Sequence, residues 1–411
     1  MANASILKKE NVLRIYKKFF VEGPVSKPEI VQATGLTLPT VHNIVNALES
    51  AGMVCKAGNA LSSGGRRAGL YKLNTKFRYI LGAYINTDYI ACGIYDLSLQ
   101  EYLYKEIPLI LANCTVSEAI SALYTLIEDI IAQSCFDRSQ ILGVGITVAG
   151  IVNSKEGYVT AITKVPHWRN VCLKEQLEGK LGLPVCIEKD TNGAALAIKW
   201  VCPLDENENL AYLSIVNGVG LSILNQGKVL RLRDGGACEL GHISVNLDGP
   251  LCACGGRGCI ELYACGSVLF SSLSEYICNA PDSKLAKLVE HDPEKLTIDK
   301  VIAAETDDTY VHREFELFKR YVVLCIDDVI KLYAPKRLII NTDWLSRHPQ
   351  QFSSIRSMLH STNTFINVNN IDICLNNMEH VNVRGGVASV LECETDDLNG
   401  STLFRFLEDT I

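Results

Sequence analysis

Between residues 242 and 259 the chain brings together one histidine and three cysteines, and this feature constrains the fold more than any other. His242 is followed, after nine intervening residues, by Cys252, Cys254 and Cys259. Three thiolates and one imidazole form the closed ligand set of a structural Zn²⁺ ion, which leaves no open coordination position for chemistry. We therefore expect a structural zinc site. A metal-free cysteine loop or a redox pair is the alternative.

The other cysteines show no second pattern of this kind. Most of the 16 stand singly in apolar segments, as Cys92, Cys186, Cys325 and Cys374 do, where reduced cysteine behaves as a small buried hydrophobe. At 411 residues the chain is long enough for two or three folding units. It starts with charged residues instead of an apolar leader, and no stretch approaches the roughly 18 apolar residues of a membrane span. We expect a soluble, cytoplasmic protein with no membrane partner.

Charge is distributed unevenly along the chain. Residues 1–75 contain ten Lys and Arg against four acids, a net charge of +6, which leaves −13 of the total of −7 for the rest. A basic segment ahead of an acidic body favours contact with the phosphates of nucleic acid. Chance clustering on solvated faces is the alternative.

Three helix patterns follow one another in this basic segment. Apolar residues recur at helical spacing from Ser5 to Val21. Ser26-Lys27-Pro28-Glu29 reads as a capping box that starts a short helix ending near Thr34-Gly35. A third helix is expected from Leu38 to about Ser50, capped by Thr37. Two short helices joined by a tight turn with glycine predict a helix-turn-helix.

The third helix has two faces of different chemistry. Its buried face is expected to comprise Val41, Ile44, Val45 and Leu48. The residues expected to contact DNA are Thr37, Pro39, Thr40, His42, Asn43 and Asn46. Their hydroxyl, amide and imidazole groups suit base edges better than the Glu and Lys of a merely solvated helix. A small protein-binding module is the alternative.

Residues 53–73 read as two short strands around a glycine-rich loop, which is typical of the wing of a winged helix. Arg66 and Arg67 stand side by side in this loop and can enter a narrow minor groove. A flexible basic linker is the alternative. Residues 1–75 are therefore predicted to be a winged helix-turn-helix domain, all-α with a β wing, whose partner is a double-stranded DNA operator.

From about residue 79 the pattern alternates between strands and helices. Strands are expected at 79–86, 90–96, 141–148 and 184–188, and helices at 116–135 and 173–181. Strands interleaved with helices predict an α/β fold with mixed sheets.

Several motifs in this body resemble one known family. The run from Glu239 to His242, followed by the one from Cys252 to Glu261, is similar to the motif of the ROK family (repressors, open reading frames and kinases). The blocks at 143–152, 166–171 and 187–195 look like further family motifs, and the resemblance covers nearly all of the chain. The N-terminal segment resembles the repressor branch, which includes xylose- and N-acetylglucosamine-responsive repressors.

The resemblance implies an architecture and a ligand. Residues 76–411 would form a two-lobed sugar kinase/actin-like effector domain, with the first lobe at about 76–188 plus a C-terminal helix at about 381–411, and the second at about 189–380. The same four zinc ligands are implied. The residues that would line a sugar site are Asp190, Glu239, His242 and Glu261. Lys189 replaces a common asparagine, which could favour a sugar phosphate or another acidic ligand; a solvated or ion-paired role is the alternative for each acid.

The nucleotide-binding motifs of the family's kinases are altered in three places. Residues 84–88, Tyr-Ile-Asn-Thr-Asp, stand where the kinases have Asp-x-Gly-Gly-Thr, and residues 214–220 and 338–342 also depart from the kinase pattern. Phosphoryl transfer needs a preorganised cradle for the phosphates. We therefore predict no catalytic residues and a protein that senses a sugar without phosphorylating it.

Together these features predict a DNA-binding transcriptional repressor of carbohydrate-metabolism genes. The resemblance and the need for two operator half-sites imply a homodimer or a dimer of dimers. Sugar binding would shift the body between conformations and so change operator affinity. Two alternatives stay open: an active ATP-dependent sugar kinase with an appended DNA-binding domain, and a scaffold whose body binds a sugar-transport protein.

Overall fold

The computed structural model describes residues 2–21, 23–59, 68–202, 208–231, 238–362 and 367–396. Arg66 and Arg67, predicted to contact DNA, lie outside these ranges. Two compact units can be separated: unit 1 comprises Met1–Leu204 and His380–Ile411, and unit 2 comprises Asp205–Glu379. Each has its own hydrophobic core. Among the described helices, none combines the length and the hydropathy that crossing a bilayer requires.

The N-terminal segment of unit 1 contains three helices and a small sheet of order β1-β3-β2. The elements are α1 Ala2–Val21, β1 Val25–Ser26, α2 Lys27–Thr34, α3 Leu38–Ser50, β2 Val54–Asn59 and β3 Gly69–Leu73. Ser26 and Glu29 form the expected capping box, and Gly35 closes α2 in the left-handed conformation. Thr37 caps α3, whose buried residues are the four predicted from the sequence.

The rest of unit 1 is built on a five-stranded sheet of order β11-β7-β4-β5-β6. Its strands are β4 Tyr79–Ile85, β5 Tyr89–Asp96, β6 Glu101–Pro108, β7 Ile141–Val148 and β11 Val185–Lys189. β4, β7 and β11 run parallel, whereas β5 is antiparallel to both of its neighbours, β4 and β6. The α/β fold predicted from the sequence is confirmed, and the predicted strands and helices end within one residue of the observed ones.

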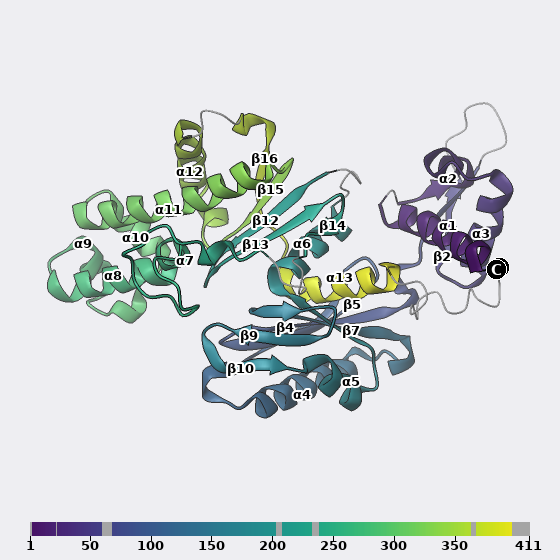
Figure 1. The fold of residues 1–411 in the computed structure, drawn as a ribbon, viewed down its shortest axis with the longest axis horizontal. Coiled ribbons are helices and arrows are strands. Elements are labelled where there is room, and N and C mark those ends of the chain that lie inside the picture. Colours follow the sequence, from purple (N-terminus) through teal and green to yellow (C-terminus); the bar gives the residue numbers. More distant parts are fainter. Residues whose placement is uncertain are drawn as a thin grey trace. The chain divides into compact units, whose positions relative to one another are not determined.

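Helices cover both faces of this sheet (Figure 1). They are α4 Val116–Ser134, α5 Leu173–Leu181, α6 Asp190–Val201 and α13 Val381–Asp396. A second, three-stranded sheet has the order β10-β9-β8 and comprises β8 Ile151–Asn153, β9 Tyr158–Ile162 and β10 Val165–Val171. α4 and α5 lie on one face of the large sheet, and α13 lies on the other.

Glycines allow α13 to approach the sheet and α6 at backbone distance. A Cβ added to Gly145 in β7 would lie 1.8 Å from the carbonyl oxygen of Gly386, and one added to Gly385 would lie 2.5 Å from the carbonyl carbon of Gly193 in α6. No side chain fits in either place. α6 therefore belongs to unit 1 through its contact with α13, and the chain passes to unit 2 only after Leu204. The family resemblance implies a lobe boundary earlier, near residue 189.

Unit 2 contains a second five-stranded sheet, of order β14-β13-β12-β15-β16. The strands are β12 Leu210–Ile215, β13 Val219–Asn225, β14 Lys228–Val229, β15 Arg337–Asn341 and β16 Asp372–Leu375. The helices are α7 Glu261–Ala264, α8 Gly266–Asn279, α9 Lys284–Leu288, α10 Ile298–Glu305, α11 Thr309–Tyr333 and α12 Pro349–Thr362.

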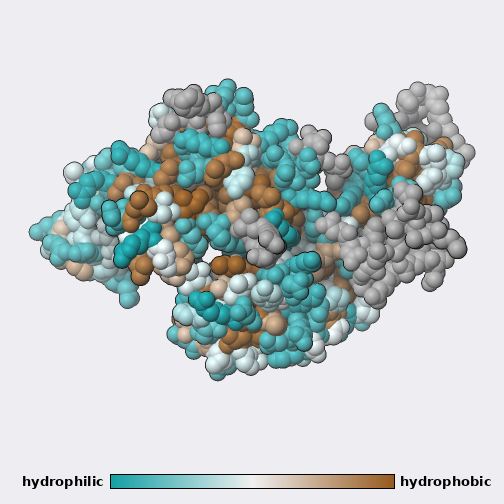
Figure 2. Space-filling model, viewed as in Figure 1, coloured by the Kyte–Doolittle hydropathy of each residue, from teal (hydrophilic) through white to brown (hydrophobic). Residues whose placement is uncertain are grey.

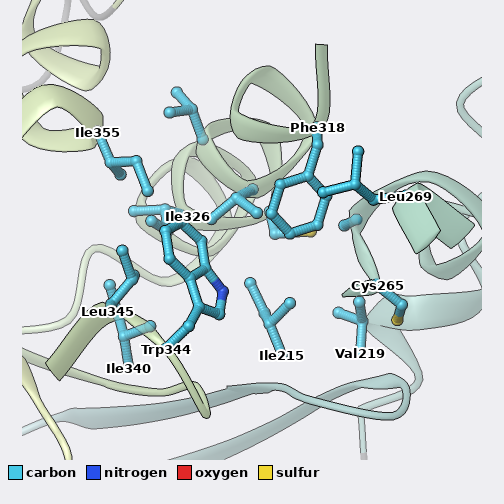
Figure 3. Packing of buried hydrophobic residues seen from close by; sticks show 14 of the residues in the cluster. Ile215, Val219, Cys265, Leu269, Phe318, Ile326, Ile340, Trp344, Leu345 and Ile355 are labelled. Carbon is cyan, nitrogen blue, oxygen red and sulfur yellow. The ribbon is translucent and has the colours of Figure 1, made fainter. Parts of the chain in front are cut away.

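Aromatic packing lies at the centre of this second core. Trp344 is 3% exposed, and its ring centroid lies 5.8 Å from that of Phe318 in α11. Figure 3 shows this tryptophan among Ile326, Leu345 and Ile355. On the outside, hydrophilic residues spread over both units with hydrophobic residues interspersed, on the face that Figure 2 shows.

Candidate functional site

The outer surface of α3 carries the residues predicted to contact DNA. Thr37, Pro39, His42 and Asn43 are exposed, and Thr40 and Asn46 are partly buried. The hydroxyl of Thr37 also accepts a hydrogen bond from the backbone N–H of Thr40, so it caps the helix as well. Exposure leaves these side chains accessible to a large partner.

A lysine from α2 joins this surface. Lys27 Nζ donates to Asn46 Oδ1 at 2.7 Å and lies 3.3 Å from His42 Nδ1, while Asn46 Nδ2 lies 3.0 Å from His42 Nε2. The same ammonium group stands 4.9 Å from the ring centroid of Tyr71 in β3. Sequence reasoning counted Lys27 only as a charge and a helix-start residue, because its neighbours lie 15 and 19 positions away.

The predicted metal ligands meet in unit 2. The ligand atoms of His242, Cys252, Cys254 and Cys259 all lie within 4.8 Å of one another. Cys252 Sγ is 3.6 Å from His242 Nδ1, and Cys254 Sγ is 3.6 Å from Cys259 Sγ. A tetrahedral zinc ion with Zn–S bonds of about 2.3 Å separates two sulfurs by about 3.8 Å. The donor set and its spacing therefore fit a tetrahedral ion.

Backbone hydrogen bonds shape the loop that holds these ligands, residues 242–259, which we call the knuckle. Cys252 N donates to Gly256 O at 2.8 Å, and Gly258 N donates to Pro250 O at 2.9 Å. Gly255 and Gly258 have φ of +93° and +61°, which glycine adopts without steric cost. A Cβ on Gly258 would also lie 1.7 Å from Asn246 O. The glycines are thus required by the path of the backbone.

The three thiols have different acidities. Burial raises the pKa of Cys252 to about 12 and also raises that of Cys259. The backbone N–H of Gly256 points at Cys254 Sγ from 3.4 Å and lowers the pKa of Cys254. A bound cation would have to displace protons from Cys252 and Cys259, since only thiolates bind metals.

Two of the predicted sugar-site acids lie at this knuckle. Glu261, the first residue of α7, places Oε1 3.4 Å from His242 Nδ1 and 3.3 Å from Cys252 Sγ. A Cβ on Gly218, in the turn between β12 and β13, would lie 3.5 Å from Glu261 Oε2. Glu239 precedes the short 3-10 helix Leu240–His242, and its backbone carbonyl oxygen accepts a hydrogen bond from the backbone N–H of His242 at 3.1 Å. The knuckle therefore positions the carboxylate of Glu261 and the backbone of Glu239.

Asp190, the remaining predicted sugar residue, lies in unit 1 as the first residue of α6. Its Oδ1 accepts the backbone N–H of Thr191 at 2.7 Å. The two preceding residues, Glu188 and Lys189, are both buried. Glu188 Oε1 accepts from Ser154 Oγ at 2.8 Å and from Asn192 Nδ2 at 3.0 Å. These bonds fix the junction of β11 and α6, and so the position of Asp190.

The turn between β4 and β5, which the sequence predicts to depart from the kinase pattern, uses its polar groups internally. Thr87 N and Oγ1 both donate to Asn86 Oδ1, at 2.6 and 3.1 Å, and Asn86 N donates to Tyr89 O at 3.0 Å. Burial raises the pKa of Tyr89, and the negative charges of Asp190 and Asp88 contribute. The turn thus combines engaged amide groups with acidic surroundings.

Side chains also connect the carboxyl ends of the unit 2 strands. Asn341, at the end of β15, donates to Ser214 Oγ at 3.2 Å and accepts from Asn376 Nδ2 at 3.0 Å. Asn376 Oδ1 in turn accepts the backbone N–H of Met378 at 3.1 Å. Ligands of open α/β sheets bind at the carboxyl ends of parallel strands. Here this edge carries a chain of amide and hydroxyl groups bonded to one another.

The fold and the site thus define an α/β protein with a Cys₃His cluster in one of its two units. The model of the ROK family matches residues 81–390. This chain belongs to the ROK family.

Three comparisons extend this assignment. The chain is 28% identical to the xylose repressor of Bacillus subtilis (strain 168) over 365 residues, which cover 88% of this chain and 89% of the relative. The crystal structure of a ROK family transcriptional regulator, a homologue of the E. coli MLC protein, covers 95% of this chain and 97% of its own, with a TM-score of 0.78 and 24% identity. The ROK glucokinase of Streptomyces griseus, solved with glucose and AMPPNP, covers 76% of this chain and 98% of its own, with a TM-score of 0.63 and 24% identity.

Proposed function

We propose that this chain is a sugar-responsive transcriptional repressor in which a winged helix-turn-helix head, residues 1–75, binds a DNA operator. One observation carries the proposal. The match to the glucokinase structure covers 98% of that structure but only 76% of this chain. The match to the transcriptional regulator structure covers 95% of this chain. The ROK family model starts at residue 81, and the segment ahead of that residue has the basic net charge and the exposed polar face of α3.

The proposed DNA contacts come from Thr37 and α3 and from the predicted wing. Thr37, Pro39, Thr40, His42, Asn43 and Asn46 would face base edges and phosphates, with Arg66 and Arg67 in the wing. The bonds of Lys27 to Asn46 and His42 would present a positive charge beside the two polar groups. A homodimer or a dimer of dimers would bring two such heads to two half-sites.

The proposed effector is a sugar or a sugar phosphate, bound by Asp190, Glu239, His242 and Glu261. Carboxylates bind sugars by accepting hydrogen bonds from hydroxyl groups. A structural zinc ion held by His242, Cys252, Cys254 and Cys259 would stabilise the knuckle that fixes Glu239 and Glu261. The ion would have no open coordination position, so it would position these side chains and take no part in chemistry.

The local chemistry of both units argues against a kinase. The backbone amides of Asn86 and Thr87 are engaged within their own turn, and the negative charges of Asp88 and Asp190 act on Tyr89 in the same turn. At the carboxyl edge of the unit 2 sheet, the side chain of Asn341 is hydrogen-bonded to Ser214 and Asn376. A nucleotide would have to replace these bonds and approach acidic groups, which is unfavourable in a partly buried site.

The experiment is operator selection with the purified protein, followed by titration of the complex with sugars. We expect nanomolar affinity for a selected duplex that falls steeply with salt, since phosphate contacts release counterions. D-xylose, D-glucose, N-acetyl-D-glucosamine and its 6-phosphate are the first effectors to titrate. Absence of salt-sensitive binding to any duplex, together with sugar-dependent ATP consumption that Asp190→Asn abolishes, would establish the kinase alternative.

A second candidate function is supported by a single observation. The knuckle exposes two leucines, Leu247 at 84% and Leu251 at 66%, and exposed apolar residues of this kind suit a protein partner. The body would then report on a sugar-transport protein instead of a free sugar. A sugar panel without effect on operator affinity, combined with operator release by a purified transport protein that Leu247→Glu prevents, would favour this function.

A further inference from the structure

The helix that carries Asp190 also contacts the N-terminal segment. Trp200 lies in the last turn of α6, and its ring packs edge-on against Phe20 of α1, with centroids 4.9 Å apart and planes at 67°. Phe20 packs edge-on against Tyr16 as well, at 5.3 Å. Tyr16 is fully buried in the N-terminal segment. Aromatic contacts therefore run from the end of α6 into the core of that segment.

α6 is held along its length by α13. Near its start, Gly193 meets Gly385 backbone to backbone. Near its end, Lys199 Nζ donates to both carboxylate oxygens of Glu392 at 2.9 Å, in an ion pair whose side chains are 22% and 12% exposed. Closely packed helices move as rigid elements because a well-packed contact has no space to deform. A displacement at the start of α6 is therefore passed on to its end.

A second attachment limits how the N-terminal segment can move. The connecting residues Thr75–Phe77 bind to the body, because Leu97 N donates to Thr75 O at 3.0 Å. The ring of Phe77 lies close to Gly52 of the N-terminal segment, since a Cβ added to Gly52 would be 3.8 Å from it. The connector therefore contacts the N-terminal segment as well as the body. One attachment allows a segment to rotate, and a second contact, at Trp200, fixes the angle of that rotation.

We propose that α6 is the mechanical link between sugar and DNA binding, and that Trp200 is the positioning residue that transmits the state of Asp190 to the head. The ten-residue separation of these two side chains spans about 15 Å of helix. A sugar bound at Asp190 displaces α6 together with α13 as one rigid element, and Trp200 turns the head about the connector. The inference rests on the proposed function, since it needs both ligands.

The test uses the full-length protein and its selected operator. Trp200→Ala, Phe20→Ala and the double variant are compared with Val201→Ala, a control at the same helix end whose side chain is 47% exposed. Operator affinity is measured without sugar and with D-xylose, D-glucose, N-acetyl-D-glucosamine or its 6-phosphate. Sugar affinity is measured separately without DNA. Hydrogen exchange of residues 190–201 is followed as operator is added.

Coupling factors of about 5- to 150-fold are typical between linked sites. We expect Trp200→Ala and Phe20→Ala each to reduce the factor by which sugar changes operator affinity to less than about twofold. The double variant should show no further loss, because both substitutions remove the same contact. Sugar affinity stays unchanged, and Val201→Ala keeps the wild-type factor. Operator binding alters exchange in residues 190–201 of the wild type but not of Trp200→Ala, since linkage is reciprocal.

Full coupling in both single variants would overturn the inference, and so would unchanged exchange of α6 on operator binding by the wild type. The exchange measurement needs no sugar, so it decides the matter even if none of the four sugars acts. If Trp200→Ala does not fold, Phe20→Ala removes the contact from the other side and leaves α6 intact. A wild-type protein that binds no duplex DNA would instead refute the proposed function itself.

Discussion

The knuckle of unit 2 and the α6–α13 contact of unit 1 place acidic side chains by opposite means. At the knuckle, Glu261 is positioned by a loop with four ligand residues and little apolar burial beyond Cys252 and Cys259. In unit 1, Asp190 is positioned by a helix that packs backbone to backbone on another helix. Backbone hydrogen bonds shape the loop, and a bound metal ion would add to its stability. The contact between helices depends instead on the absence of side chains.

Removing a metal ligand is expected to have the largest effect. Cys252→Ser takes away a buried thiol of the cluster, which also donates a hydrogen bond to Glu261. Structural zinc sites contribute apparent free energies of about 10–16 kcal/mol in small domains. We expect metal analysis to fall from about one zinc per chain to none, with a lower thermal midpoint and loss of sugar binding.

Cys278→Ser is the matched control, because Cys278 is an exposed thiol of the same unit. It should keep both metal and stability. Zinc retained at full content in Cys252→Ser would show that the knuckle does not depend on these four ligands.

Adding one methyl group tests the other kind of contact. Gly145→Ala places a Cβ 1.8 Å from Gly386 O, so β7 and α13 must move apart. We expect a loss of about 3 kcal/mol or more in the free energy of unfolding of unit 1, measured by urea denaturation. Gly179→Ala in α5, where the Cβ meets nothing within 4 Å, should instead stabilise the protein by about 0.5–1 kcal/mol. Equal stability of the two variants would contradict the close contact.

Zinc binding at the knuckle should depend on pH, because the metal displaces protons from thiols. The pKa of Cys252 is raised to about 12 and that of Cys259 is raised as well, so both thiols carry protons at neutral pH in the metal-free chain. Binding of zinc must release these protons, and affinity therefore rises as pH rises. Two released protons give about a 100-fold gain per pH unit, measurable by competition with a chelator between pH 6 and 8. A pH-independent affinity would contradict protonated thiols.

The smallest expected effect concerns the exposed surface of α2 and α3, which neither the knuckle nor a glycine contact between helices positions. Lys27→Ala removes the cation that bonds to Asn46 and approaches His42. We expect operator affinity to fall by about tenfold, and the slope of log affinity against log salt to decrease by about one if Lys27 also meets a phosphate. Lys287→Ala, in α9 of unit 2, is the control. Equal operator affinity of the two variants would place DNA elsewhere.

Local chemistry made much of this structure predictable from the sequence. The Ser26–Glu29 box, the Thr37 cap and the buried stripe of α3 depend on neighbours within a few residues, and they are found as expected. The Cys₃His cluster was predictable because its spacing is short. The contact of Lys27 with Asn46, the Asn341–Asn376 bond and the meeting of Gly193 with Gly385 were not predicted. They join residues that only tertiary packing brings together.

The position of α13 in the chain has a consequence for synthesis. This helix covers the glycine-lined face of the first sheet, but it follows the 175 residues from Asp205 to Glu379. At ribosomal rates of about 5–20 residues per second, that face waits roughly 10 to 35 seconds for its cover. Unit 2 can fold during this interval, since its core draws on its own residues alone. Nascent chains should therefore be most open to chaperones, and to aggregation through the uncovered sheet, before α13 leaves the ribosome.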